Sequence, residues 1–255
     1  MRAAIRVLAR RALVNATRRP QFLVPLVTFP TLVLAINVGG LERTTTLPGF
    51  PRVDGFLDFQ LAAAITQSLL LGGVSAGLAV ALDIEGGFFD RLVASPAPRS
   101  AIVLGRVLAA GVVAAIQVVY FLVLGLVFGA EIRGGLVGVL CVLAIGVVAG
   151  TGFGALGVLI ALRARSASVV QGIFPIVFVV LFASSAFFPA DLLSSPVDAV
   201  AAYNPLSYIA EGMRQPIAFG NELAPMLEGL AAAAAVTAAA IALSLHALRG
   251  RLRDA

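Results

Sequence analysis

The chain has 255 residues, of which 60% are hydrophobic and 12% are charged, and its mean hydropathy is +1.03. Soluble domains carry about 25% charged residues, so this composition excludes an ordinary soluble domain and indicates an integral membrane protein. All 18 basic side chains are arginines, and the formal net charge is +5. A P-loop needs a lysine that reaches the nucleotide phosphates, so the absence of lysine excludes a P-loop ATPase site in this chain.

Single residues exclude further kinds of site. Cys141 is the only cysteine and His246 the only histidine, which excludes an intrachain disulfide and a histidine-cluster metal site. We expect no catalytic residue, no metal site and no cofactor in this chain. The pI of about 10.6 is typical of nucleic-acid-binding proteins. Because the arginines flank apolar runs, the sequence favours the lipid membrane as partner and not a nucleic acid.

Residues 1–19 predict an amphipathic helix. Arg2, Arg6 and Arg10 recur every four residues on one face, and apolar residues such as Ile5 lie on the other. A basic amphipathic helix of this kind lies in the headgroup layer of a membrane. A simple positively charged anchor before the first span is the alternative. A cleavable signal peptide is disfavoured, because the apolar run is too long and no Ala-x-Ala motif follows it.

A helix that crosses a hydrocarbon core of about 30 Å needs about 20 apolar residues. Six such runs predict an all-α membrane protein with six transmembrane helices in a single domain, residues 1–255. Pro25 and Pro30 in the first run and Pro175 in the fifth predict kinks. The predicted spans are Gln21–Val38, Phe59–Leu82, Ser100–Phe128, Gly134–Leu162, Ala167–Phe188 and Leu223–Leu248.

The arginines divide unevenly between the two sides that these spans define. Four of the 18 fall on one side, and the rest fall on the side of the two termini. The positive-inside rule therefore predicts that both termini and the charged segment Asp83–Arg99 are cytoplasmic. The arginine- and alanine-rich composition is typical of a GC-rich bacterium, so we expect a multi-pass protein of the bacterial inner membrane. The four outer arginines are Arg43, Arg52, Arg133 and Arg214.

The fourth span carries glycines separated by multiples of four residues. Small residues at this spacing let helix backbones approach closely, and the partner is either a neighbouring helix or a second copy of the chain. These glycines are Gly134, Gly138, Gly146, Gly150 and Gly154.

The connection of residues 189–221 is expected on the outer side, although much of it is apolar. Ser195 and Asn204 are each followed by a proline, a typical helix start, which predicts two short re-entrant helices; an ordinary loop is the alternative. Glu211 and Arg214 are spaced for an ion pair one helical turn apart. The predicted apolar face of the second helix consists of Leu206, Ile209, Ala210, Met213 and Ile217.

The segment Asp83–Arg99 is a charged, glycine- and proline-containing stretch between the second and third spans. Phe88 and Phe89, with apolar residues one turn later, predict a two-turn helix that ends at Ser95 before two prolines. A helix this short has no core of its own, so the two phenylalanine rings need other atoms to bury them. Either a partner protein buries the rings or they insert into the lipid interface, and the residues alone leave both open.

This segment resembles the cytoplasmic loop of ABC-2-type transporter permeases, a family that includes daunorubicin-resistance-type drug exporters and polysaccharide exporters. The resemblance covers nearly the whole chain, and the order and spacing of its motifs make it specific. Its motifs are Glu85-Gly86, Arg91-Leu92, Ser95-Pro96 and Arg99, followed by Tyr203-Asn204-Pro205-Leu206-Ser207-Tyr208 and Glu211-Gly212-Met213-Arg214.

The resemblance implies a separate ABC ATPase subunit in two copies, a second copy of this chain, and ATP and Mg bound on the ATPase. It implies that Asp83–Arg99 forms a coupling helix whose phenylalanines fill a groove of the ATPase. The ATPase-coupling residues would be Glu85, Gly86, Phe88, Phe89, Arg91, Pro96 and Arg99. The outer gate would consist of Asn204, Pro205, Glu211 and Arg214.

The predicted function is the membrane-spanning permease of an ATP-driven exporter that moves a hydrophobic or amphipathic drug, lipid or glycolipid outward by alternating access. The substrate path would lie between two copies and be lined by Gln60 and Gln67 of the second span and by Phe174, Phe178 and Phe182 of the fifth. The alternative is that these phenylalanines face lipid.

Two other functions are alternatives to this one. Gly73-Val74-Ser75-Ala76-Gly77 matches the G-x-S-x-G spelling, which with His246 would give an intramembrane serine protease. The same glycines fit a helix-packing motif. An ion-coupled secondary transporter is disfavoured, because no charged residue lies mid-span in the second or fifth span.

Overall fold

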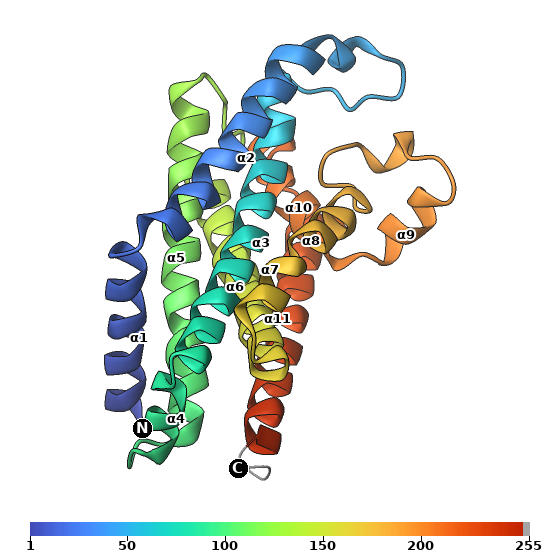
Figure 1. The fold of residues 1–255 in the computed structure, drawn as a ribbon. Coiled ribbons are helices and arrows are strands. Elements are labelled where there is room, and N and C mark those ends of the chain that lie inside the picture. Colours follow the sequence, from blue (N-terminus) through green and yellow to red (C-terminus); the bar gives the residue numbers. More distant parts are fainter. Residues whose placement is uncertain (252–255) are drawn as a thin grey trace.

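The computed structural model describes residues 1–251, and every regular element in that range is helical (Figure 1). Within this range, five helices are long and apolar enough to cross a membrane, which agrees with a multi-pass membrane protein. The predicted cytoplasmic Arg253 lies outside the described residues, as does the side chain of Arg251. The five helices are α2 (Pro20–Leu41), α3 (Phe56–Glu85), α5 (Arg99–Val127), α6 (Gly135–Ala164) and α11 (Leu223–Arg251).

The predicted fifth span, Ala167–Phe188, is not one continuous helix. It is divided into α7 (Ala167–Gly172) and α8 (Phe174–Phe182), and at 1.5 Å per residue the pair is only about 24 Å long. The break falls where Gly172 weakens the helix and Pro175 lacks a backbone donor. The six-span architecture is therefore not confirmed.

Helix α3 lies in the middle of the bundle and packs closely on α6 (Figure 1). A Cβ atom added at Gly73 would lie 2.6 Å from the carbonyl oxygen of Phe153, and one added at Gly77 would lie 2.6 Å from that of Gly157. No side chain larger than hydrogen fits at these positions. The glycines of the G-x-S-x-G spelling therefore serve the contact between α3 and α6.

Three of the five predicted stripe glycines face α5 within the same chain, whereas Gly134 and Gly138 lie against Pro216 of η3 (Gln215–Phe219). A Cβ atom at Gly150 or Gly154 would collide with the side chain of Ala114 or Ala110, and Gly146 lies against Val118. Of the two partners that the spacing allowed, the structure shows the neighbouring helix.

The predicted N-terminal helix is present as α1 (Arg2–Thr17), and it stands beside α5 (Figure 1). Ala9 and Ala12 of its apolar face are buried, and Gly105 of α5 leaves room for the side chain of Leu8. The helix is confirmed, whereas its place in the headgroup layer stays a prediction.

Both outer helices are present, as α9 (Val197–Tyr203) and α10 (Pro205–Arg214). Helix α10 begins where the sequence predicts it, whereas α9 begins one residue later than expected, with Pro196 and not Ser195 as its N-cap. The five residues of the predicted apolar face are each 3% exposed or less. Helix α10 thus packs into the core of the bundle, against α3 and α11. The remaining short turns are η1 (Glu42–Thr46), η2 (Ala190–Leu192) and η3 (Gln215–Phe219).

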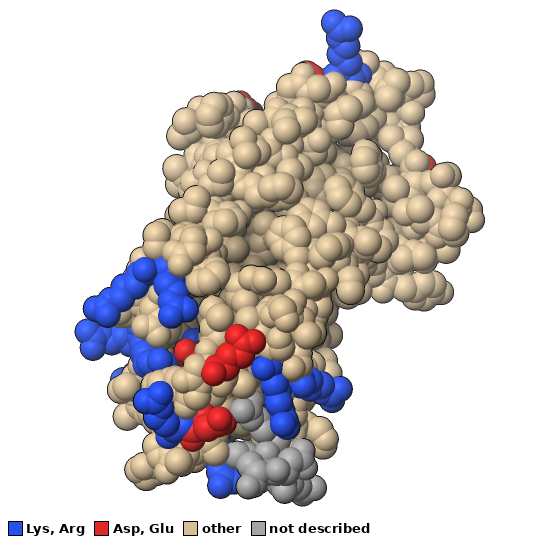
Figure 2. All heavy atoms as spheres, viewed as in Figure 1, with Lys and Arg blue, Asp and Glu red and all other residues tan. Residues whose placement is uncertain are grey.

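Charged side chains gather at one end of the bundle. Figure 2 shows most of the basic side chains of the visible face over its lower part, where α1 and α4 (Phe88–Ala94) lie. Helix α11 ends at the same end of the molecule at which α1 begins (Figure 1). This asymmetry agrees with the predicted division of the arginines, and the assignment of that end to the cytoplasm stays a prediction.

Candidate functional site

The charged stretch Asp83–Arg99, called the coupling segment below, folds as the end of α3, the short helix α4 and a proline-containing turn into α5. Gly87 has φ +67°, in the left-handed region that favours glycine, and this turns the chain from α3 into α4. The hydroxyl of Ser95 donates to the carbonyl of Leu92 at 2.7 Å where α4 ends. The predicted two-turn helix is confirmed.

The expectation that both phenylalanines of α4 need cover from outside the chain is wrong for Phe89, whereas Phe88 is half-buried. Phe89 is 4% exposed and belongs to an apolar cluster with residues of α3, α5 and α6. The ring of Phe88 lies under Arg11 of α1, with the guanidinium carbon 3.4 Å from the ring centroid. Helical periodicity could not reveal this cover, because it comes from parts of the chain that are distant in sequence. On the other side of α4, Arg91 is exposed.

Asp83 at the end of α3 joins three helices. Its carboxylate pairs with Arg106 of α5 and lies 3.5 Å from Arg11 of α1. We call these three residues the arginine triad. Burial lowers the pKa of Arg11, and the partly buried pairs are screened less by salt than pairs on an open surface. Sequence analysis missed the triad, although an arginine inside an apolar run, as Arg106 is, normally has a partner.

Glu85 connects the coupling segment to the divided fifth span. Its carboxylate accepts a hydrogen bond at 2.8 Å from the backbone N–H of Ala167, the first residue of α7. The first N–H groups of a helix have no partner within the helix, so Glu85 satisfies one of them. Among the other predicted coupling residues, Gly86, Pro96 and Arg99 are exposed.

Arg214, a predicted outer-gate residue, is fully buried and fully partnered. It pairs with Glu211 at 2.5 Å, its Nε donates to the Phe59 carbonyl at 3.1 Å, and its terminal nitrogens donate to the carbonyls of Ser185 and Ala186. The guanidinium carbon also lies 3.9 Å from the centroid of the Phe59 ring. A buried arginine without such partners would be strongly unfavourable.

Asn204, like Arg214, binds the chain at or just after the end of α8. Its side-chain oxygen accepts from the N–H of Leu206, which caps α10 as predicted, with Pro205 as the first helical residue. Its amide nitrogen donates to the carbonyls of Val180 at 2.8 Å and Ala183 at 3.0 Å. Asn204, Glu211 and Arg214, called the outer cluster below, therefore all bind the short stretch of residues 180–186.

A second ion pair lies at the end of the molecule that is predicted to be the outer one. Arg133 pairs with Asp54 at 2.5 Å, and this exposed contact raises the pKa of Arg133. Unlike Arg214, which is fully buried, both members of this pair are exposed to solvent.

Gln60 and Gln67 do not line an open path within this chain. Both amide side chains are 1% exposed, because α3 is the central helix of the bundle. Gln60 donates to the carbonyl of Phe187 at 3.3 Å, and the described residues offer no hydrogen-bond partner to the Gln67 side chain. The expected position of these two residues on the substrate path is thus not supported.

The predicted phenylalanines of the fifth span form a ladder along α8. The ring centroids of Phe174 and Phe178 lie 5.1 Å apart, and those of Phe178 and Phe182 lie 6.3 Å apart. Phe29 of α2 meets Phe178 edge-on at 5.6 Å. Phe174, at one end of the ladder, borders a cavity of about 500 Å³ between α2, α3 and α7–α8, which we call the lateral groove.

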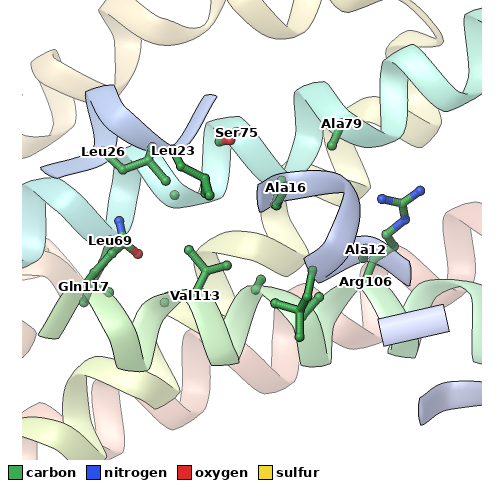
Figure 3. A pocket seen from close by; sticks show the side chains of 16 residues that line it. Ala12, Ala16, Leu23, Leu26, Leu69, Ser75, Ala79, Arg106, Val113 and Gln117 are labelled. Carbon is green, nitrogen blue, oxygen red and sulfur yellow. The ribbon is translucent and has the colours of Figure 1, made fainter. Parts of the chain in front are cut away.

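A smaller cavity of about 70 Å³ lies between α1, α2, α3 and α5, with Arg106 and Gln117 at opposite ends (Figure 3). It is too small for a drug-sized ligand. Ser75 on its wall donates its hydroxyl to the Phe22 carbonyl at 3.3 Å, and no bond to His246 exists among the described residues. The geometry therefore does not support a serine–histidine dyad.

No protein with a curated description matches this chain. A family model described as ABC-2 type transporter matches residues 3–217. The match includes the coupling segment, the arginine triad and the outer cluster, and it extends from α1 into η3. The chain therefore belongs to the ABC-2 type transporter family, whose membrane domains carry no ATPase site and pair with ABC ATPase subunits.

Proposed function

We propose that this chain is the membrane subunit of an ATP-driven exporter with two copies of the chain and two ABC ATPase subunits, on which ATP and Mg bind. The cargo would be a hydrophobic or amphipathic molecule, such as a drug of the daunorubicin type, a lipid or a glycolipid. The protein would lie in a bacterial inner membrane with both termini in the cytoplasm. Family membership supports the subunit type, and the following contacts support the mechanism.

The observation that carries the proposal is the position of the arginine triad beside α4. A displacement of α4 acts on α1 through the contact of Phe88 with Arg11, and on α5 through Asp83 and Arg106. The same segment reaches α7 through Glu85. A force applied to this short helix would therefore move several long helices together, as a rigid-body mechanism requires.

The surface that would dock the ATPase is the polar side of the coupling segment. Arg91, Pro96 and Arg99 are exposed there, next to Gly86 and Glu85. Phe89 would support this surface from within, because its ring is buried by the chain itself. Phe88 is half-buried with one face of its ring under Arg11, so part of this ring would remain available to the ATPase.

Helices α7 and α8 would transmit the movement to the outer face. Glu85 holds the first N–H of α7, and the outer cluster binds the end of α8 and the residues after it. We expect the cargo to pass along the phenylalanine ladder, of which Phe174 and Phe182 are 42% and 49% exposed. Movement of α8 would then change both the path and the outer gate, which gives alternating access.

Reconstitution of the purified chain in proteoliposomes, with and without an ABC ATPase encoded beside it, tests the proposal. We expect ATP-dependent transport of an amphipathic dye only when the ATPase is present. Transport by this chain alone under an ion gradient would favour the ion-coupled alternative. Failure of the two proteins to co-purify would count against the exporter.

A further inference from the structure

We propose that α7 and α8 form a strap whose middle moves between two positions. One is the position described above, beside α2. In the other, the strap lies against α6 and fills a cavity that now separates the two. The movement would widen the lateral groove and so regulate access to the cargo path. That role rests on the proposed function, whereas the movement itself is a property of the single chain.

The strap has a cavity on each side. On the side of α2 lies the lateral groove of about 500 Å³, and on the side of α6 lies a second cavity of about 110 Å³, which we call the rear cavity. Val74 of α3 lines both cavities. A sideways displacement of the strap therefore fills one cavity as it enlarges the other. The strap contributes Gln171, Gly172, Phe174 and Pro175 to the groove, and Val170, Ile173 and Val177 to the rear cavity.

The strap is held at its two ends and not along its middle. At its start, the N–H of Ala167 donates to Glu85 at 2.8 Å. At its end, Leu181 is fully buried, next to the stretch that the outer cluster binds. Between these ends, residues 171–180 are all half-buried or exposed. The middle can therefore shift while both ends keep their contacts.

The backbone is weakest where α7 meets α8. Pro175 has no N–H to donate, and the hydrogen bond from the Ile173 N–H back to the Val170 carbonyl is 3.3 Å long. A Cβ atom added at Gly172 would meet no atom within 4 Å, so close packing does not fix the chain at this point. The angle between the two short helices can thus change without loss of the hydrogen bonds inside either one.

Each position has its own stabilising contacts. In the present position, Phe178 of the strap meets Phe29 of α2 edge-on at 5.6 Å. In the second position, Ile173 and Val177, which are now half-buried, would enter the rear cavity. Side chains that line a cavity lack contact atoms on one side, so filling it restores dispersion contacts and offsets the loss of the aromatic pair. The wall that α6 presents to the strap is apolar and consists of Phe153, Leu156, Gly157 and Ile160.

The experiment uses the full chain in nanodiscs, without an ATPase and without cargo. Spin labels on Ile36→Cys of α2 and Ile176→Cys of the strap, in a Cys141→Ser background, report the distance between the two elements. Both labelled positions are exposed, and Cys141 is the only native cysteine. We expect two distances, of which the longer belongs to the strap against α6. A single distance would overturn the proposal.

Two substitutions should shift the populations in opposite directions. Ile160→Phe places a ring in the rear cavity and should lower the population with the longer distance about tenfold, because the strap would then overpack against α6. Phe29→Leu removes the aromatic contact with Phe178 and should raise that population. The matched control is Ile116→Phe on the exposed face of α5, which should change neither population. Equal effects of Ile160→Phe and this control would contradict the proposal.

Xenon tests the rear cavity without a substitution in its walls. The gas occupies dry apolar cavities, so xenon under pressure should deplete the longer distance in the labelled chain and have no effect when Ile160→Phe is also present. The absence of any xenon effect would show that the rear cavity does not receive the strap. Because no ATPase takes part, an immobile strap would leave the exporter proposal standing. Failure of ATP-dependent transport would likewise leave the two distances unexplained by anything but the strap.

Discussion

Arg11 of α1 lies over the ring of Phe88 in α4, with 3.4 Å between the guanidinium carbon and the ring centroid, and the same guanidinium is 3.5 Å from Asp83. The contact joins the N-terminal helix to the coupling segment, although the two are far apart in the sequence. A cation–π contact of this kind contributes about 0.5–2 kcal/mol. The N-terminal helix is thus in direct contact with the coupling segment.

Replacement of Arg11 should weaken the transmission of force from α4. We expect Arg11→Gln to lower ATP-driven transport by about tenfold, the equivalent of about 1.4 kcal/mol, while ATP hydrolysis by the partner continues. Arg10→Gln is the matched control, because Arg10 is exposed on the neighbouring position of α1. Equal transport by the two variants would show that the contact does not serve coupling.

The docking surface can be tested with a single charge reversal. Arg91→Glu should prevent co-purification with the ATPase and leave the membrane subunit folded, since Arg91 is exposed. Phe89→Ala is unsuitable for this purpose, because truncation of a buried phenylalanine costs about 3–5 kcal/mol of stability. Arg43→Glu at the outer end should not affect docking; if it does, the predicted orientation is wrong.

Replacement of the buried Arg214 should destabilise the part of the protein around the outer cluster. Arg214→Met leaves Glu211 without its counter-charge and several carbonyls without a donor, and we expect a loss of about 3–5 kcal/mol. Arg133→Met removes a solvent-exposed partner of Asp54 and should change the unfolding midpoint little. Thermal unfolding in detergent measures both. A similar midpoint for the two variants would contradict the burial of Arg214.

Replacement of Glu211 tests the outer gate separately from the ATPase. Glu211→Ala should change the accessibility of residues near the outer cluster to a membrane-impermeant reagent, because Arg214 and the Ser185 hydroxyl lose a shared partner. Co-purification with the ATPase should be unchanged. Loss of docking in this variant would mean that the topology is inverted.

The close contact between α3 and α6 gives a prediction about stability. Gly157→Ala places a methyl group against the backbone of Gly73 and Gly77, and overpacking of this kind costs about 1–3 kcal/mol or more. Gly40→Ala in α2 meets no atom within 4 Å and should be neutral or stabilising. A neutral Gly157→Ala would mean that these helices lie further apart than described.

Much of the fold is predictable from local patterns. Apolar runs gave the long helices, because burial of the backbone in a membrane forces each run to form a helix. The start of α10 followed from Asn204-Pro205, and that of α9 followed from Ser195-Pro196 to within one residue. The pairing of Glu211 with Arg214 followed from their spacing. Each of these features depends on residues that are close together in the chain.

The features that could not be predicted depend on contacts between distant segments. The apolar run after Ala167 has the composition of a span, yet its glycine and proline divide it into α7 and α8. Gln60 and Gln67 lie in a helix that is apolar on all sides, so periodicity could not tell whether they face a path or the protein core. The cover of Phe88 by Arg11 arises only when α1 packs beside the coupling segment.

The outer cluster binds its neighbours mainly through their main chain. Arg214 and Asn204 together bind the backbone carbonyls of five residues: Phe59, Val180, Ala183, Ser185 and Ala186. Every amino acid has such a carbonyl, so the side chains of α8 can change without removing these hydrogen bonds. In the proposed exporter, substitutions in the phenylalanine ladder would therefore change the cargo and leave these hydrogen bonds of the outer cluster in place.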